Sequence, residues 1–258
     1  MKTPLDHGAF KKRVSTGEAT FGIFLGLATP MAIEIAAIAG MDWVLLDLEH
    51  GPMGEDQVGS VVTTAGTYGI TSLVRVESDD RIRINRVLDA GIAGVMVPRV
   101  ESAAQVREAV SHFSTPPFGD RGVATYNRGA LWGQELGFLD GPSKATCIIQ
   151  IETVGALESV EEIAAIEGVD ILFVGPADLS FALGVPRDFK NPIFTSALDR
   201  VLSAAKSCGK QAGILAPNGS SAADYLHMGF KFIGIASDSI LLADSMKKNL
   251  IEAKKEHK

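Results

Sequence analysis

Eight short runs of aliphatic and β-branched residues recur along the 258-residue chain, and stretches with helical periodicity separate them. Six of the runs begin one or two residues after a glycine that closes a helical stretch, which is typical of the position just past a helix C-terminus. These glycines are Gly40, Gly69, Gly91, Gly168, Gly209 and Gly229. Apolar strands that alternate with helices are typical of parallel sheets covered on both faces. Eight of them predict a closed (β/α)8 barrel, known as a TIM barrel.

The predicted strands are TFGIFLGL, DWVLLDL, TSLVRV, AGVMVP, TCIIQIE, DILFVG, QAGIL and KFIGIA. The helices between them show start signals, such as Pro30 in a first turn and Ser102 as a candidate N-cap. The length suits a single barrel domain over residues 1–258, since barrels of this size are often undivided. A doubly wound open sheet is the alternative, although no Gly-x-Gly-x-x-Gly follows the first strand.

Composition excludes several classes of partner. The formal net charge of −7 opposes binding to nucleic acid, because such proteins carry clustered Lys and Arg. Cys147 and Cys208 lie far apart without metal-ligand spacing, so neither a disulfide nor a structural zinc is expected. The first residues lack the apolar region of a signal peptide, and no apolar run reaches membrane-spanning length. We therefore expect a cytoplasmic protein without a membrane or nucleic-acid partner.

One segment, residues 113–144, breaks the alternation of strands and helices. It is rich in glycine and proline and lies between the fourth and fifth predicted strands. Loops of this length in compact domains are usually functional or mobile. The sequence leaves its path open, and either a lid or a subunit contact would suit it.

Polar residues follow the apolar strands where each strand ends. The clearest case is LLDLEHGP at 45–52, where a buried strand gives way to two acids and a histidine. The strand-end residues in order are Asp47, Glu49, His50, Arg75, Pro98, Arg99, Gln150, Glu152, Asp178, Pro217, Asn218, Ser237 and Asp238. The carboxyl ends of the strands meet at one face of a barrel, so these side chains predict a functional site there.

Glu152 and Asp178 are the candidate metal ligands. Hard cations such as Mg²⁺ and Mn²⁺ bind one or two carboxylates and fill the remaining positions with water or substrate oxygens. The alternative is that each acid favours the N-terminus of the helix that follows it. No lysine stands at a predicted strand end, so a Schiff-base reaction lacks its amine. A reaction through a carbanion would then need a metal as electron sink.

Arg75 and His50 are the candidate groups for substrate and proton. Arg75 leaves an apolar strand, so it needs an anion, either a substrate carboxylate or an ion pair with Glu77 or another strand-end acid. His50 suits proton transfer near neutral pH, although metal binding or simple packing are alternatives for a single histidine.

DLEHGP at 47–52, QIET at 150–153 and GPADLS at 175–180 occur in the order found in the HpcH/HpaI aldolase family, which the chain resembles over nearly its whole length. The motifs LVRV at 73–76 and GDRGVA at 119–124 add to the match. The resemblance implies a metal-dependent class II pyruvate aldolase, like those for 4-hydroxy-2-oxo-heptanedioate or 2-dehydro-3-deoxyglucarate. It also implies a TIM barrel with an exchanged terminal helix, assembled as a hexamer.

The resemblance assigns roles to single residues. His50 matches the catalytic histidine, Arg75 the enolate-stabilising arginine, and Glu152 and Asp178 the ligands of a divalent metal ion such as Mg²⁺, Mn²⁺ or Co²⁺. The residues that match the pyruvate-binding wall, with Arg75, are Gln150, Gly175, Pro176 and Ala177.

Asp89 matches an acid that partners the catalytic histidine. It stands just before Gly91, at the opposite end of the predicted barrel from His50. A neighbouring subunit of a homo-oligomer would therefore have to supply it. Otherwise Asp47 or Glu49 orients the histidine.

The implied reaction cleaves a 4-hydroxy-2-oxo acid to pyruvate and an aldehyde, through an enolate that the metal and Arg75 stabilise. Two other functions are weighed against it: a lyase for CoA thioesters of the citramalyl-CoA type, and a non-catalytic barrel that serves binding or assembly. No basic run near the predicted barrel mouth suits a nucleotide diphosphate. The segment 125–142 departs from the best-known members, which leaves the acceptor aldehyde open.

Overall fold

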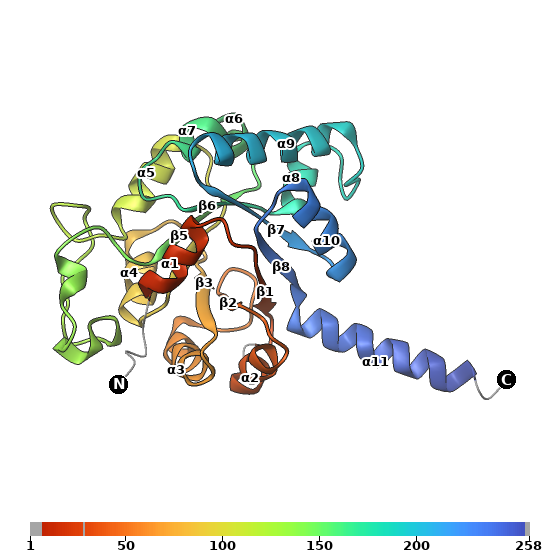
Figure 1. Cartoon of the computed structure of the whole chain (residues 1–258), viewed down its shortest axis with the longest axis horizontal. Helices are drawn as coiled ribbons and strands as arrows, with labels where there is room; N and C mark the ends of the chain where they lie inside the picture. The colour runs from red at the N-terminus through yellow and green to blue at the C-terminus, as the bar shows by residue number, and fades with distance from the viewer. Residues whose placement is uncertain (1–6, 28, 256–258) are drawn as a thin grey trace.

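The computed structural model describes residues 7–27 and 29–255, so residues 1–6, 28 and 256–258 of the predicted 1–258 domain lie outside it. Eight parallel strands close into a barrel in chain order, which confirms the predicted fold class (Figure 1). The strands are β1 (Thr20–Leu25), β2 (Trp43–Asp47), β3 (Thr71–Arg75), β4 (Gly94–Val97), β5 (Thr146–Ile151), β6 (Ile171–Val174), β7 (Gln211–Ala216) and β8 (Phe232–Ser237).

Helices surround the barrel, and capping residues and glycines mark where they begin and end. Pro30 is the first residue of helix α2 (Pro30–Ile38). The Ser102 side chain caps helix α5 (Ala103–Ser111) by accepting the Gln105 N–H at 3.3 Å. The six glycines predicted to end helices all have positive φ. The α-helices are α1 (His7–Ser15), α2 (Pro30–Ile38), α3 (Val58–Tyr68), α4 (Arg81–Asp89), α5 (Ala103–Ser111), α6 (Val154–Glu158), α7 (Val160–Ala164), α8 (Pro176–Ala182), α9 (Pro192–Ser207), α10 (Gly219–Met228) and α11 (Asp238–Lys255), with short 3₁₀ helices η1 (Glu55–Gln57), η2 (Arg128–Gly133) and η3 (Gly137–Leu139).

Alternate residues of each strand belong to two separate apolar layers. On β2, Val44 and Leu46 pack outward against helices, whereas Trp43 and Leu45 fill the barrel interior. The interior is aromatic, and the Trp43 ring stacks on that of Phe232 with centroids 4.3 Å apart. Because successive side chains of a strand point to opposite faces, the inward row of each strand leads from this aromatic layer up to the barrel mouth.

Helix α1 closes the amino-terminal end of the barrel. Its Phe10 and Val14 join the interior layer, and the Phe10 ring meets Phe232 edge to face at 6.5 Å. Lys11 fastens the helix by an ion pair with Asp170 at 3.0 Å, just before β6. This end of the barrel is therefore filled by packed side chains.

The long segment 113–144 lies at the amino-terminal end of the barrel, beside α4. The Gly122 N–H donates to the Asn85 side chain on α4 at 3.1 Å, and Arg121 pairs with Asp89 at 2.7 Å. The segment leads from the end of α5 to the start of β5, and η2 packs against α4 (Figure 1). It therefore cannot act as a lid over the strand-end site of its own chain. The subunit contact stays a prediction.

Helix α11 leaves the barrel instead of packing along it (Figure 1). Its first residue, Asp238, accepts the backbone N–H of Gly26 at 2.6 Å and that of Leu27 at 3.1 Å, which ties the start of the helix to the end of β1. From Ile240 to Lys255 every described side chain is exposed. Within residues 7–27 and 29–255, no helix is long and apolar enough to cross a membrane.

Candidate active site

Three polar side chains of the site continue the inward rows of the barrel interior. Asp47, Arg75 and Gln150 each stand two residues beyond an apolar side chain of the interior layer, which are Leu45, Leu73 and Ile148 respectively. The period of two therefore brings all three to the mouth on the inner face. All three are buried.

Arg75 is held by the last residue of the neighbouring strand and by an acid two residues beyond it. The register of β2 and β3 places Asp47 beside Arg75, whose Nε and Nη2 donate to the two Asp47 oxygens at 2.8 and 2.7 Å. Nη1 lies 3.1 Å from Glu49 Oε2, and the guanidinium covers the Phe24 ring at 5.4 Å. The ion-pair alternative is thus met by Asp47 and Glu49 instead of Glu77.

We call Arg75 and the two acids that hold it, Asp47 and Glu49, the arginine clamp. Burial and the contacts within the clamp shift the pKa values of both acids. Burial acts to raise the pKa of Asp47, but the hydrogen bonds and charge of Arg75, together with the backbone N–H groups of His50 and Glu49, hold that pKa below its ordinary value. For Glu49, burial dominates over the attraction of Arg75 and raises the pKa. Because buried pairs of this kind are costly to break, Arg75 is a fixed cation at the mouth.

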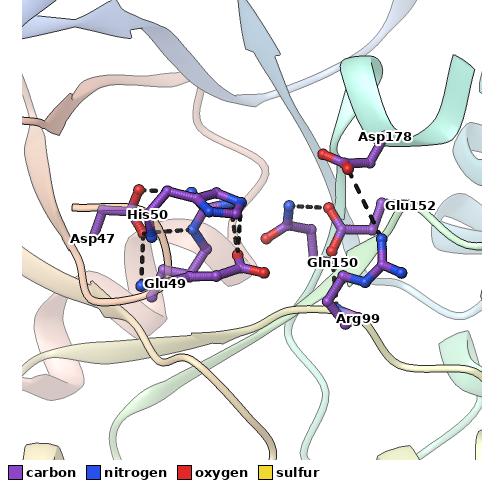
Figure 2. A network of polar contacts seen from close by, with 8 residues as sticks. Asp47, Glu49, His50, Arg99, Gln150, Glu152 and Asp178 are labelled. Carbon is purple, nitrogen blue, oxygen red and sulfur yellow. Dashed lines mark hydrogen bonds and ion pairs between the residues drawn. The ribbon is translucent and has the colours of Figure 1, made fainter. Parts of the chain in front are cut away.

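His50 stands at the rim, with its side chain 65% exposed. Its Nε2 lies 3.8 Å from Glu49 Oε2, while its backbone N–H donates to Asp47 Oδ1 at 3.3 Å (Figure 2). Asp47 thus shapes the turn, and Glu49 is the described acid beside the ring. An exposed imidazole next to a carboxylate can exchange a proton with a bound substrate.

Asp89 lies at the other end of the barrel in the same chain. It is the last residue of α4, and its carboxylate is paired with Arg121. Its assignment as the partner of His50 therefore needs a second copy of the chain and stays a prediction.

Glu152 is the most deeply placed acid of the site, with 1% of its surface exposed. Its Oε1 accepts the backbone N–H of Arg99 at 2.9 Å, and its Oε2 accepts a hydrogen bond from Gln150 (Figure 2). Burial raises the pKa of Glu152, the Arg99 N–H opposes this, and the charges of Glu49 and Asp178 raise it further. A cation nearby would relieve this destabilised carboxylate.

Asp178 lies in the first turn of α8, opposite Glu152, with half of its side chain exposed. Gly175 caps this helix and lies directly against the buried pair. A Cβ there would stand 2.6 Å from Glu152 Oε2 and 2.9 Å from Gln150 Nε2, so only glycine leaves these side chains in place. Pro176 begins the helix, and Ala177 follows it.

Glu152 and Asp178 fit a hard divalent cation. The two offer carboxylate oxygens on one side of the mouth, and Gln150 Oε1 is buried without a hydrogen-bond partner among the described residues. No group of three His, Cys, Asp or Glu side chains forms a metal cluster in the described parts of the chain. The remaining positions would fall to water and substrate oxygens, as is common for Mg²⁺.

Arg99 was expected at a strand end, without an assigned role. In the structure it takes the left-handed conformation, with φ of 56°, and contacts both Glu152 and Asp178. A non-glycine residue in this region is uncommon and cannot be recognised from the sequence. The signal that existed was its position directly after the fourth strand.

The fold and the site together define an enzyme-like (β/α)8 barrel with an arginine clamp, an exposed imidazole and a carboxylate pair at its carboxyl-terminal mouth. The family described as HpcH/HpaI aldolase/citrate lyase matches residues 20–245. The chain belongs to this family, which confirms the resemblance seen in its motifs.

Named relatives support the same grouping. The chain is 36% identical to a pyruvate aldolase of Rhizobium etli over 94% of its own length and 95% of the relative. It is also 36% identical to a hydroxypyruvate/pyruvate aldolase of Pseudomonas aeruginosa, over 92% and 90% of the two chains. A crystal structure of an HpcH/HpaI aldolase/citrate lyase family protein from Burkholderia cenocepacia superposes with a TM-score of 0.91 at 33% identity, covering 96% of this chain and 99% of that one.

Proposed function

We propose that this protein is a carbon–carbon lyase that cleaves a 4-hydroxy-2-oxo acid to pyruvate and an aldehyde, and catalyses the reverse condensation, with a divalent cation. The observation that carries this function is the division of the mouth into two sides. Glu152 and Asp178 lie on one side, and His50 lies on the other with Asp47 and Glu49 (Figure 2), the two acids that pair with Arg75. The aldolase names of relatives at 36% identity agree with it.

A cation held by Glu152 and Asp178 would polarise the 2-oxo group and offset the negative charge that develops when the C3–C4 bond breaks. Arg75 supports the same charge from the opposite side. A guanidinium has five N–H donors, and two of them form the hydrogen bonds to Asp47, so donors remain for a substrate oxygen. Because Asp47 and Glu49 hold it in place, Arg75 needs little reorganisation during the reaction.

His50 would move the proton. Its ring takes the proton of the 4-hydroxyl, which lets the C4 oxygen become the aldehyde carbonyl as the C3–C4 bond breaks. Glu49, 3.8 Å from Nε2, stabilises the imidazolium that results. A proton returned to C3 completes pyruvate. Gln150, Gly175, Pro176 and Ala177 stay the predicted binding wall for the pyruvate part.

The comparisons give no support to the two alternative functions. The relatives carry aldolase names, and neither the CoA-thioester lyase nor the non-catalytic barrel is favoured. The test of the proposal is a screen of 4-hydroxy-2-oxo acids with added Mg²⁺, Mn²⁺ or Co²⁺, with pyruvate as the measured product. A panel of such acids that gives no pyruvate with any of the metals would contradict it.

We also propose a homo-oligomer, a hexamer by resemblance, in which α11 packs on a second copy. The helix keeps an apolar side uncovered, and so does α2. The exposed apolar residues are Met31, Ile35, Ile38, Ile240, Leu241, Leu242, Met246, Leu250 and Ile251. An 18-residue helix gains most of its stability from burying such a face.

Light scattering is therefore expected to show a species well above 27.3 kDa. Deletion of α11 should lower the mass of that species. A fully active monomer would exclude both the exchanged helix and the supply of Asp89 by a neighbouring subunit. The cytoplasmic location stays a prediction, which cell fractionation would check.

A further inference from the structure

Arg99 contacts both carboxylates that are proposed to hold the cation. It follows β4, and its left-handed backbone turns its N–H toward Glu152 Oε1, 2.9 Å away. Its side chain lies on the side of Glu152 that faces away from His50, with Nη1 3.8 Å from Asp178 Oδ1 (Figure 2). One residue thus reaches one acid with its backbone and the other with its side chain.

The two contacts have opposite consequences for a bound cation. The backbone N–H is a neutral dipole that fixes the orientation of Glu152 and stays in place whatever the side chain is. The guanidinium carries a positive charge. That charge lies beside Asp178 and repels a second cation on the same carboxylate.

The pair between Arg99 and Asp178 is too weak to block the site. The side chains are 58% and 49% exposed, and an exposed pair at 3.8 Å contributes little stability. Asp178 can therefore turn to a metal ion while the guanidinium stays nearby.

We infer that Arg99 is a built-in counter-cation that weakens divalent-cation binding to the Glu152 and Asp178 pair and so keeps the metal exchangeable. The inference rests on the proposed function. It makes Arg99 a residue that tunes the site by charge, since its backbone, and not its side chain, orients Glu152.

The expected size follows from the charges. A guanidinium about 6 Å from a divalent ion in a water-like dielectric changes the dissociation constant by about tenfold. The side chains of Arg99 and Asp178 are both about half exposed, so salt should screen the repulsion. The screening length is roughly 10 Å at 0.1 M ionic strength.

The test is a titration of metal-stripped, full-length protein with Mn²⁺, followed by the electron paramagnetic resonance signal of the free ion. Arg99→Gln and Arg99→Met should bind Mn²⁺ about tenfold more tightly than the natural protein, and the gain should shrink at high salt. Arg99→Lys, which keeps the charge, should bind Mn²⁺ within about twofold of the natural protein.

Glutamine, methionine and lysine are unbranched, so each meets the same backbone cost at φ of 56° as arginine. Arg99→Gly, which adopts that φ freely, should tighten binding as well and guards against a folding defect.

Arg107→Gln is a matched control. Arg107 has the same 58% exposure and a similar pair, 3.9 Å from Glu162, but lies on α5. It should leave Mn²⁺ affinity unchanged.

Unchanged or weaker binding in folded Arg99→Gln and Arg99→Gly would overturn the inference, as would equal tightening in Arg99→Lys, since that points to a steric effect. Glu152→Gln distinguishes a failure of the Arg99 inference from a failure of the proposed metal site. If Mn²⁺ binding survives that change undiminished, the proposed metal site itself is wrong, and the inference falls with it.

Discussion

His50→Ala is expected to slow aldol cleavage by about 10²–10⁴-fold while largely sparing the decarboxylation of oxaloacetate. Both reactions pass through the enolate of pyruvate, so both need the same stabilisation of negative charge. Only aldol cleavage needs a base for the 4-hydroxyl, because carbon dioxide leaves oxaloacetate without one. The exposed ring of His50, beside Glu49, is placed to supply that base.

The measurement is kcat for both reactions at saturating metal, with metal content determined for each variant. His227→Ala, an exposed histidine at the end of α10, is the control and should change neither rate. Equal losses in both reactions at unchanged metal content would show that His50 serves the enolate and that its role as base is wrong.

Glu152→Gln is expected to lower both reactions together, by about 10³-fold or more, because a catalytic metal supplies several kcal/mol of charge stabilisation. Glutamine has nearly the same shape, so it fits beside Gly175 and can still accept the Arg99 N–H at Oε1, while its Nε2 donates to Gln150 once the Gln150 amide flips to present its oxygen. The change therefore removes a charge and spares the packing.

Steady-state rates for the two reactions check this, with Glu162→Gln as the control. Glu162 lies exposed on α7 and contacts no part of the mouth described above. A Glu152→Gln enzyme that keeps activity within tenfold of the natural protein would mean that Glu152 is not a metal ligand. An effect on aldol cleavage alone would assign it to proton transfer instead.

The barrel could be predicted from the sequence because its signals are local. A glycine such as Gly69 ends a helix by adopting positive φ, and the apolar run that follows it becomes a strand. The same signals located the strand ends, and with them Glu152, Asp178, Arg75 and His50. Barrel closure then brought these residues to one mouth.

Contacts between strands could not be predicted, because strand register is set by the folded sheet. The sequence left open which acid would meet Arg75, and the pairing of β2 with β3 placed Asp47 opposite it. The conformation of Arg99 was hidden for a related reason: its positive φ is imposed by its surroundings and not by its own preference.

The path of residues 113–144 also depended on tertiary contacts. Its glycines and prolines indicate a loop but say nothing of the end of the barrel on which it lies. Asn85 and Asp89 on α4 hold it there through Gly122 and Arg121. The departure of α11 was expected only from the family resemblance, since its helical periodicity fits a packed helix equally well.

Metal dependence of pyruvate release tests the central claim most directly. Full-length protein would be stripped by prolonged chelation, assayed with a 4-hydroxy-2-oxo acid that the untreated enzyme cleaves, and assayed again after addition of Mg²⁺ or Mn²⁺. Two carboxylates and water bind such ions only moderately, so stripping should abolish pyruvate formation and metal should restore it. Full activity in the stripped, metal-free protein would contradict the account.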